Sequence, residues 1–327
     1  MRQESSTRET RAVLGVRLTI DHVAYSPVPP AGANDLADVW TVVLDRPSPE
    51  RDVFRQCLSS DELQRAIRFR FAHDRNHFIV ARAALRTILA FYSGVRKDQI
   101  AFEYGPFGKP TLASNSASGI ELQFNVSHSH GIALVAVSRS CPLGIDIERD
   151  SPTCSLESIA KAAFSPEEAK SLAAARPRAL LQHWTCKEAY VKAQGVGLSR
   201  DPGQFQIVIG DGLGYALDAA RAQRADPGWM VGHLPTVDGF VAALAAESRN
   251  LIVRVIQPFW STGIALPAVV PSQFPTHSPA AGNAADAGRL VRRPAGEAME
   301  TLDGGVRRIN SMVPSDVRNM AESDKTG

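Results

Sequence analysis

Apolar residues recur with two different periods through the first half of the chain. Residues 39–44 form a compact run rich in β-branched side chains, which predicts a buried strand. Ser59 and Glu62 have the spacing of a capping box, which predicts the start of a helix. Apolar positions then follow helical spacing over residues 74–92, so a second helix is expected there, ended by Gly94. Short strands are predicted after it, at residues 100–102, 122–126, 132–138 and 143–147.

The second half repeats this order of elements more loosely. Ser165 and Glu168 form another capping box, with Pro166 at the first helical position, where its missing N–H costs nothing. A helix is predicted over residues 179–193, ended at Gly195. Strand-like runs follow at residues 205–209, 240–245 and 251–256. We therefore expect an α+β fold of two similar halves with antiparallel strands, joined near residues 139–143, although no internal repeat is visible residue by residue.

The composition changes at both ends of the chain. Residues 1–37 mix charge, Pro and Gly without clear periodicity, which predicts a flexible leader. Residues 259–327 are rich in Ala, Gly, Pro and Ser, so a disordered tail is expected, with a short helix possible near residues 315–321. The folded part then divides into an N-terminal half at residues 38–141 and a C-terminal half at residues 142–258.

Composition and charge are those of an ordinary globular protein. The 327 residues carry a formal net charge of +2, so no strong field marks the chain as a partner of nucleic acids or membranes. The first twenty residues lack the apolar core of a secretory signal, and no run approaches the ~20 apolar residues that span a bilayer. Four cysteines without a C-x-x-C pair suit neither a disulfide framework nor a zinc site. These features predict a protein of the reducing cytoplasm.

The sharpest chemical signal is the sequence Gly-Ile-Asp-Ile-Glu at residues 144–148. Alternate side chains of a strand share a face, so Asp146 and Glu148 project together while Ile145 and Ile147 face the core. We expect the two carboxylates at a solvent-facing strand edge, where a hard divalent cation with oxygen ligands relieves their repulsion. An acidic outer strand face without a metal is the alternative.

A second signal lies on the helix predicted over residues 179–193. Its apolar stripe includes Leu181 and Trp184, which puts Glu188 on or beside the buried side. A carboxylate there needs a partner, and Lys192 lies one turn further along the same side. The alternative is an ordinary ion pair between residues four positions apart.

A glycine-rich loop at residues 103–110 offers a cation that suits phosphate. Gly105 and Gly108 let the backbone approach a ligand, and Lys109 supplies a point charge. The spacing of the glycines and the following Pro110 exclude a P-loop. A plain surface turn is the alternative.

The segment at residues 124–131 is predicted to be a strand that runs into a polar loop. Ser127 and His128 are candidates for binding phosphate oxygens. A metal site from His128 and His130 is a further alternative, but two histidines without other ligands seldom form one. A serine hydrolase is excluded because no G-x-S-x-G elbow is present. The alternative is an ordinary polar loop that binds no ligand.

Taken in order, these segments resemble the signature motifs of Sfp-type 4′-phosphopantetheinyl transferases. The matching segments are F-N-V-S-H-S at 124–129, G-I-D-I-E at 144–148, W-T-C-K-E-A-Y-V-K-A-Q-G-V-G-L at 184–198, G-K-P at 108–110 and F-S at 164–165. The resemblance covers about residues 38–257. It implies a pseudo-twofold pair of α/β halves, with coenzyme A bound in the cleft between them, in a protein that acts as a monomer.

The resemblance also implies a reaction and the residues that carry it. The reaction moves 4′-phosphopantetheine from coenzyme A to a serine of an acyl or peptidyl carrier protein and releases 3′,5′-ADP; fatty-acid, polyketide and nonribosomal-peptide carriers all remain possible. Asp146, Glu148 and Glu188 would hold Mg²⁺ in the C-terminal half, Glu188 would act as the base, and Lys192 would neutralise the leaving bisphosphate. The residues expected to bind coenzyme A are Arg65, Lys109, Pro110, Ser127, His128, Lys187 and Lys192.

One position departs from the family pattern, and two other functions compete. His77 stands where some members place Arg, so a cationic contact to the 3′-phosphate comes from Arg75, Arg65 or protonated His77, or is weaker. The first competing function is a metal-dependent phosphoesterase that directs water at the same pyrophosphate. The second is a degenerate homologue that binds coenzyme A or carrier protein without turnover. The intact set of three carboxylates and Lys192 argues against degeneration.

Overall fold

The strands of the described residues form sheets of six, five and two strands. The computed structural model describes residues 7–13, 16–23, 35–113, 121–150, 163–172, 174–196, 202–218 and 228–259. The six-stranded sheet has the order β1 (Thr7–Val13), β2 (Val16–Val23), β13 (Asn250–Phe259), β3 (Asp35–Val43), β7 (Ile132–Ser138) and β6 (Gln123–Ser129). The five-stranded sheet has the order β8 (Leu143–Arg149), β12 (Phe240–Ala246), β11 (Met230–Leu234), β10 (Leu213–Asp218) and β9 (Phe205–Gly210). The small hairpin consists of β4 (Phe102–Tyr104) and β5 (Pro110–Leu112).

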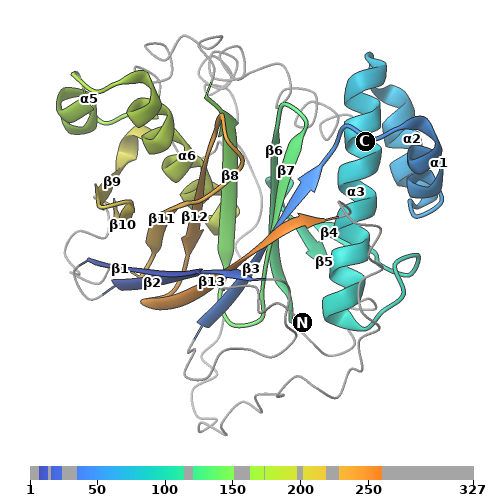
Figure 1. Ribbon diagram of the computed structural model, residues 1–327, viewed down its shortest axis with the longest axis horizontal. Helices are drawn as coiled ribbons and strands as arrows, with labels where there is room; N and C mark the ends of the chain where they lie inside the picture. Colours follow the sequence, from blue (N-terminus) through green and yellow to red (C-terminus); the bar gives the residue numbers. More distant parts are fainter. Residues whose placement is uncertain are drawn as a thin grey trace, which may run out of the picture.

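The described α-helices lie on the outer sides of the two larger sheets, which pack against each other (Figure 1). They are α1 (Ser48–Arg55), α2 (Ser60–Arg68), α3 (Ala72–Ser93), α5 (Pro166–Leu172) and α6 (Pro177–Gln194). Helix α3 packs on the first sheet through a core that includes Trp40, and α6 packs on the second through a core that includes Ala243. A third core lies between the sheets, where Val39 of β3 and Ile145 of β8 belong to one cluster. The layers therefore follow the order α, β, β, α.

The chain passes from the first sheet to the second between β7 and β8, near the junction expected from the sequence. The order of elements after that point, helices followed by strands, agrees with the expected second half. Strand β13 departs from the expectation of antiparallel pairing, because it pairs parallel with both β2 and β3. The physical reason is that β13 arrives from β12 of the other sheet, so no hairpin constrains its direction.

Each half contains a buried glutamate in an equivalent position, a repeat that was not recognised in the sequence. Glu62 is the third residue of α2, completes the predicted capping box, and accepts a hydrogen bond from Arg86 of α3 at 2.7 Å. Glu168 is the third residue of α5, completes the second predicted capping box, and accepts a hydrogen bond from Lys187 of α6. In each half, a capping-box glutamate thus ties a short helix to the long helix that covers the sheet.

The N-terminal segment differs from the flexible leader expected over residues 1–37. Strands β1 and β2 form an antiparallel hairpin there, and β3 already begins at Asp35. Leu18 and Ile20 of β2 are buried in the core between the sheets, at alternate positions of a strand that its charged residues obscured in the sequence. Residues 260–327, including the helix considered near 315–321, lie outside the described residues. Within the described part of the chain, no helix has both the length and the apolar character that crossing a membrane requires.

Candidate active site

Helix α6 lies directly over strand β8 because β8 has a glycine at the point of contact. A Cβ atom added to Gly144 would lie 2.2 Å from the carbonyl oxygen of Ala189 and 2.2 Å from the amide nitrogen of Ala193. A side chain at this position would collide with the helix backbone, so glycine permits the close approach. Glu188 and Lys192 each precede one of these alanines, and α6 therefore brings them to the same strand.

Strand β8 turns its two carboxylates toward α6. Asp146 and Glu148 lie on the face opposite Ile145 and Ile147, which are fully buried in the core between the sheets, as the alternation of the sequence predicted. The expected solvent-facing edge is not found for Asp146, which is only 2% exposed. The physical reason is that side chains of α6 and β6 contact it, and neither element could be located beside β8 from the sequence.

Asp146 is held by two side chains through one oxygen only. Lys192 Nζ lies 2.6 Å from Asp146 Oδ1, and Ser127 Oγ donates to the same oxygen at 2.9 Å. The other oxygen, Oδ2, is buried and has no hydrogen-bond partner among the described residues. A buried carboxylate oxygen without a donor is costly unless a ligand satisfies it. Oδ2 therefore marks a position that suits a bound cation.

Two glutamates share the environment of Asp146. Burial raises the pKa of Glu188 to about 7; the charge of Lys192 lowers it and that of Asp146 raises it. Burial and the charge of Asp146 raise the pKa of Glu148 to about 8, against a hydrogen bond from Ser129 Oγ at 3.2 Å. Carboxylates that repel one another in a desolvated site form a donor set for a hard divalent cation with oxygen ligands. The three acidic residues therefore offer oxygen donors of the kind that Mg²⁺ prefers.

Edge strand β6 presents a ladder of polar side chains to the edge of β8. Three backbone amides of β8 donate to Asn125 Oδ1, Ser127 Oγ and Ser129 Oγ, at 2.9, 3.3 and 3.2 Å. These side chains take the place of a neighbouring strand and so join the two halves beside the carboxylates. Asn125 and Ser129 were not recognised as site residues from the sequence. Their alternation with Ser127 in F-N-V-S-H-S is the signal that could have identified them.

Lys109 reaches this region from the first half. Its Nζ donates to the carbonyl oxygens of Ala193 at 2.8 Å and Leu143 at 3.2 Å, at the C-terminal end of α6, where helix carbonyls lack partners. Burial lowers the pKa of Lys109 to about 8. Here the ammonium group joins the two halves through main-chain carbonyls. Pro110 follows it directly and begins β5.

Lys187 does not lie where the sequence-based expectation put it. Its side chain is fully buried, and its ammonium binds the carboxylate of Glu168 and the carbonyl oxygen of Phe205, the latter at 2.8 Å. Because α5, α6 and β9 enclose this group, Lys187 faces a structural carboxylate rather than a phosphate site. Helical periodicity could not indicate this, since Glu168 is brought to Lys187 by the packing of α5 on α6.

Arg65 and His128 were also expected to bind coenzyme A. The guanidinium carbon of Arg65, on α2, lies 5.3 Å from the ring centre of Phe78 on α3. His128 is half-buried on β6 and alternates with Ser127, so it points to the opposite face of the strand. The alternative metal pair of His128 and His130 belongs to no metal-binding cluster of the described residues.

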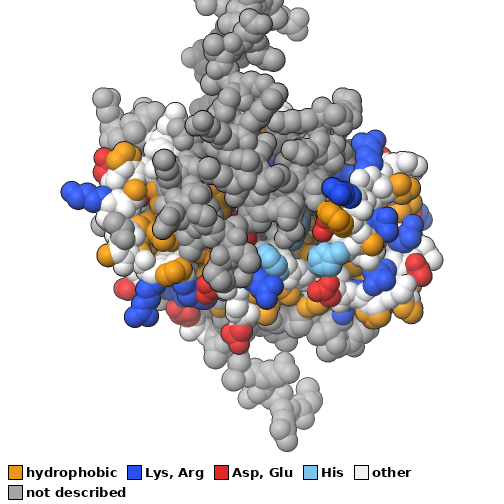
Figure 2. Space-filling view, turned by 90° about the horizontal axis from the view of Figure 1, so that it is seen from above, with side chains coloured by type: hydrophobic (Ala, Val, Ile, Leu, Met, Phe, Trp, Pro, Cys, Tyr) orange, Lys and Arg blue, Asp and Glu red, His pale blue; other side chains and the backbone are white. Residues whose placement is uncertain are grey.

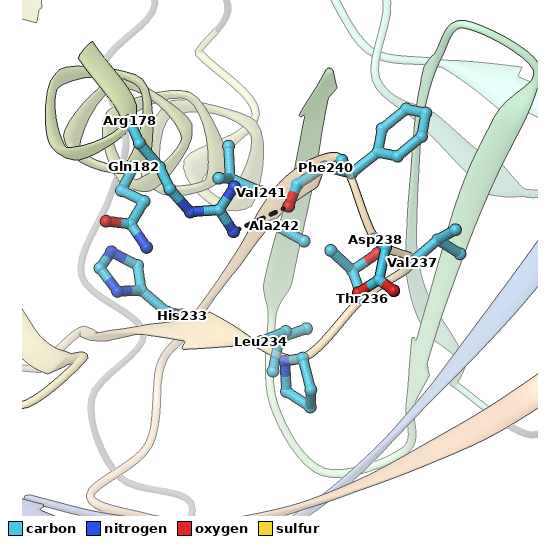
Figure 3. A pocket seen from close by; sticks show the side chains of 12 residues that line it. Arg178, Gln182, His233, Leu234, Thr236, Val237, Asp238, Phe240, Val241 and Ala242 are labelled. Atoms are coloured by element: carbon cyan, nitrogen blue, oxygen red, sulfur yellow. Dashed lines mark hydrogen bonds between the residues drawn. The ribbon is translucent and has the colours of Figure 1, made fainter. Parts of the chain in front are cut away.

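A separate cavity of about 380 Å³ opens at the other end of α6 (Figure 3). Arg178 and Gln182 of α6 lie across it from His233 and the turn between β11 and β12, and Arg178 donates to the carbonyl oxygen of Phe240 at 3.3 Å. Burial lowers the pKa of His233 to about 4, so this imidazole is neutral at pH 7. The lining includes none of the site residues expected from the sequence. This cavity is therefore distinct from the carboxylate site.

Comparison with known proteins identifies both halves. Residues 142–245 match the family described as the 4′-phosphopantetheinyl transferase superfamily, and residues 46–140 match the family described as 4′-phosphopantetheinyl transferase, N-terminal.

Individual relatives agree with this assignment. The chain is 38% identical over 216 residues to the 4′-phosphopantetheinyl transferase HetI of Nostoc sp. (strain PCC 7120), an alignment that covers 65% of this chain and 88% of the relative. It is 30% identical over 179 residues to a 4′-phosphopantetheinyl transferase of Bacillus subtilis, covering 53% of this chain and 77% of the relative. It is 29% identical over 175 residues to Sfp of Bacillus subtilis (strain 168), covering 52% and 75%. The chain therefore belongs to the 4′-phosphopantetheinyl transferase superfamily.

Proposed function

We propose that this protein transfers the 4′-phosphopantetheine group of coenzyme A to a serine of an acyl or peptidyl carrier protein, with Mg²⁺ bound by Asp146, Glu148 and Glu188. One observation carries the proposal: the buried Oδ2 of Asp146 has no partner among the described residues, at a point where three carboxylates and Lys192 interact electrostatically. Carboxylates that bind Mg²⁺ together with substrate phosphates are the usual arrangement for this cation. Membership of the family supports the identity of the group transferred.

In the proposed reaction, the serine oxygen attacks the phosphorus that carries the pantetheine arm. The bond from that phosphorus to the bridging oxygen breaks, and 3′,5′-ADP leaves. Glu188 is assigned as the group that takes the serine proton; burial raises its pKa to about 7 while no cation is bound. Bound Mg²⁺ would supply charge neutralisation of the pyrophosphate. Because a carboxylate that also binds a cation is a weak base, correct positioning of the serine contributes much of the acceleration.

Residues of both halves contribute the proposed contacts to coenzyme A. Lys192 and Ser127 already meet at Asp146, so we assign them to the pyrophosphate end of the substrate, where Lys192 would stabilise charge on the leaving bisphosphate. Lys109 lies at the same end of α6 and would exchange its two carbonyl partners for a phosphate oxygen. Arg65, Pro110 and His128 are assigned to the remainder of coenzyme A. Lys187 has no part in this assignment.

We further infer that the protein acts as a monomer in the cytoplasm. Both walls of the proposed site come from one chain, since β6 and Lys109 belong to the first half and β8 and α6 to the second. Cys57, Cys141 and Cys186 are buried free thiols, which suits a reducing compartment. Light scattering coupled to gel filtration tests the monomer.

The decisive experiment mixes the purified protein with Mg²⁺, coenzyme A and an apo carrier protein and records the intact mass of the carrier. The expected result is a gain of one phosphopantetheine per carrier, lost when EDTA is added and restored by excess Mg²⁺. Carriers from fatty-acid, polyketide and nonribosomal-peptide systems are tested in parallel, because recognition depends on the carrier surface.

Two other outcomes would overturn the proposal. Cleavage of coenzyme A to free phosphopantetheine, without modification of any carrier, would identify a metal-dependent phosphoesterase. Binding of coenzyme A by a folded protein that changes neither molecule would identify a non-catalytic homologue. A circular dichroism spectrum of the same sample establishes that the protein is folded.

A further inference from the structure

A second group of metal-binding side chains lies in the first half of the protein. Asp45 follows strand β3, and His73 and His77 lie in the first turns of α3, four residues apart. A spacing of four residues puts two histidines on one face of a helix. On the face of the molecule in Figure 2, histidine side chains are visible at the surface beside acidic and basic side chains. The ligand atoms of Asp45, His73 and His77 all lie within 4.8 Å of one another.

The distances in this group are close to those of a metal site. His77 Nε2 lies 2.8 Å from Asp45 Oδ1, and His73 Nε2 lies 4.0 Å from the same oxygen. A tetrahedral zinc ion with bonds of about 2.0–2.2 Å holds its ligand atoms roughly 3.3–3.5 Å apart. The two observed separations bracket that value. The side chains of His73 and Asp45 are 64% and 70% exposed, so they have room to rotate toward these separations.

The carboxylate of Asp74 orients the imidazole ring of His73 for metal binding. The Nδ1 atom of His73 lies 3.3 Å from Asp74 Oδ1, while its Nε2 atom is the one directed to Asp45. A histidine that binds a metal through one nitrogen commonly donates from the other to a carboxylate, which fixes its tautomer and orientation. The structure therefore contains both the three ligand groups and an outer carboxylate that orients one of them.

The surroundings leave room for a further ligand. Asp45, His73 and His77 line a cavity of about 310 Å³ whose other lining residues include Arg46 and Arg51. The two guanidinium groups lower the affinity for a cation, although Arg46 is 3.3 Å from the carboxylate of Glu50 and Arg51 donates to a backbone carbonyl. An ion held by three side chains keeps at least one coordination position open to the cavity.

We propose that Asp45, His73 and His77 form a binding site for one divalent transition-metal ion of the Zn²⁺ class, separate from the carboxylate site. Two imidazoles and one carboxylate suit Zn²⁺ better than Mg²⁺, which prefers an all-oxygen shell. The bound ion joins the end of β3 to the start of α3. The site contains none of the three carboxylates assigned to Mg²⁺ above.

The test uses the full chain with Asp146→Asn, so that the carboxylate site contributes little, in a buffer with excess Mg²⁺. Zn²⁺ binding is measured by equilibrium dialysis with metal analysis, and Co²⁺ is added as a spectroscopic probe. We expect one Zn²⁺ per chain, visible absorption bands of four-coordinate Co²⁺, and a rise in Tm on adding Zn²⁺. His73→Ala should weaken Zn²⁺ binding at least tenfold, and Asp74→Asn by about 10–100-fold.

The matched control for Asp74→Asn is Asp98→Asn, which removes an exposed carboxylate that is paired with Arg96 and lies outside the cluster. This variant should bind Zn²⁺ within about twofold of its parent. Absence of bound Zn²⁺ in the parent, or equal binding by the parent and His73→Ala, would overturn the proposal. Because His73 is mostly exposed, the metal-free melting curves of these variants should coincide.

Discussion

Lys192 Nζ and Asp146 Oδ1 lie 2.6 Å apart, in an ion pair that joins helix α6 to strand β8. The pair satisfies only one oxygen of Asp146, because Oδ2 is buried and without a partner among the described residues. The ammonium group thus supplies part of the positive charge that three neighbouring carboxylates require. The position at Oδ2 is left for a second cation, which is the basis of the proposed Mg²⁺ site.

Asp146→Asn should therefore abolish most of the carrier modification without unfolding the protein. Asparagine has the same shape, but it lacks the charge that holds a divalent cation, so the rate should fall by about 10²–10³. Intact-mass kinetics of the carrier measure the rate, and a thermal melt measures stability. Asp98→Asn removes an exposed carboxylate paired with Arg96 and should leave the rate unchanged. Equal rates in Asp146→Asn and the unchanged protein would remove Asp146 from the metal site.

Glu188→Gln should affect turnover much more than binding of coenzyme A. If Glu188 takes the serine proton, its loss should lower kcat by about 10²–10⁴, the usual contribution of a general base. The Kd for coenzyme A, measured by calorimetry in the presence of Mg²⁺, should change far less. A comparable loss in kcat and in coenzyme A affinity would instead make Glu188 a metal ligand only.

The local geometry around the candidate site could be predicted from the sequence because its residues lie in short, regular segments. The alternation in Gly-Ile-Asp-Ile-Glu correctly predicted that Asp146 and Glu148 share one face of a strand. The two Ser-x-x-Glu capping boxes correctly predicted where α2 and α5 begin. These features depend on local geometry, which a sequence pattern can express.

The rest depends on contacts between segments that are far apart in the chain. The burial of Asp146 requires both β6 and α6, and the ion pair of Lys187 requires Glu168 from another helix. Charged residues interrupt strands β1 and β2, so their apolar positions become clear only once the strands pair with each other and β2 pairs with β13. Helix α1, with Pro49 in its first turn, was likewise missed beside the stronger capping signal of α2.

Gly144→Ala should destabilise the protein and reduce transferase activity together. The new Cβ atom would lie 2.2 Å from the backbone of α6, so the helix that carries Glu188 and Lys192 must move away from β8. Overpacking of this kind costs about 1–3 kcal/mol of unfolding free energy, which urea denaturation measures. Gly210→Ala is the matched control, because its Cβ atom would meet nothing within 4 Å. Equal stability of the two variants would show that α6 does not depend on a glycine at position 144.

The stability of the protein in acid should depend on Glu168. Burial alone would raise the pKa of this carboxylate, but hydrogen bonds from His183 at 2.9 Å, from Lys187 and from backbone amides lower it to about 2. The folded-state pKa is thus below the unfolded value of about 4.5. The stabilisation is therefore fully present above pH 4.5 and is lost as the pH falls toward 2. It is on the order of 3 kcal/mol.

Glu168→Gln should remove this dependence. Its unfolding free energy should fall less steeply between pH 5 and pH 3 than that of the unchanged protein. The variant should also be less stable at pH 7, because it leaves the buried ammonium of Lys187 without its counter-charge. Adding Lys187→Met should recover part of that loss at pH 7 while the acid slope stays shallow. Glu167→Gln, at an exposed neighbouring position, should keep the original slope; if Glu168→Gln keeps it too, another carboxylate governs unfolding in acid.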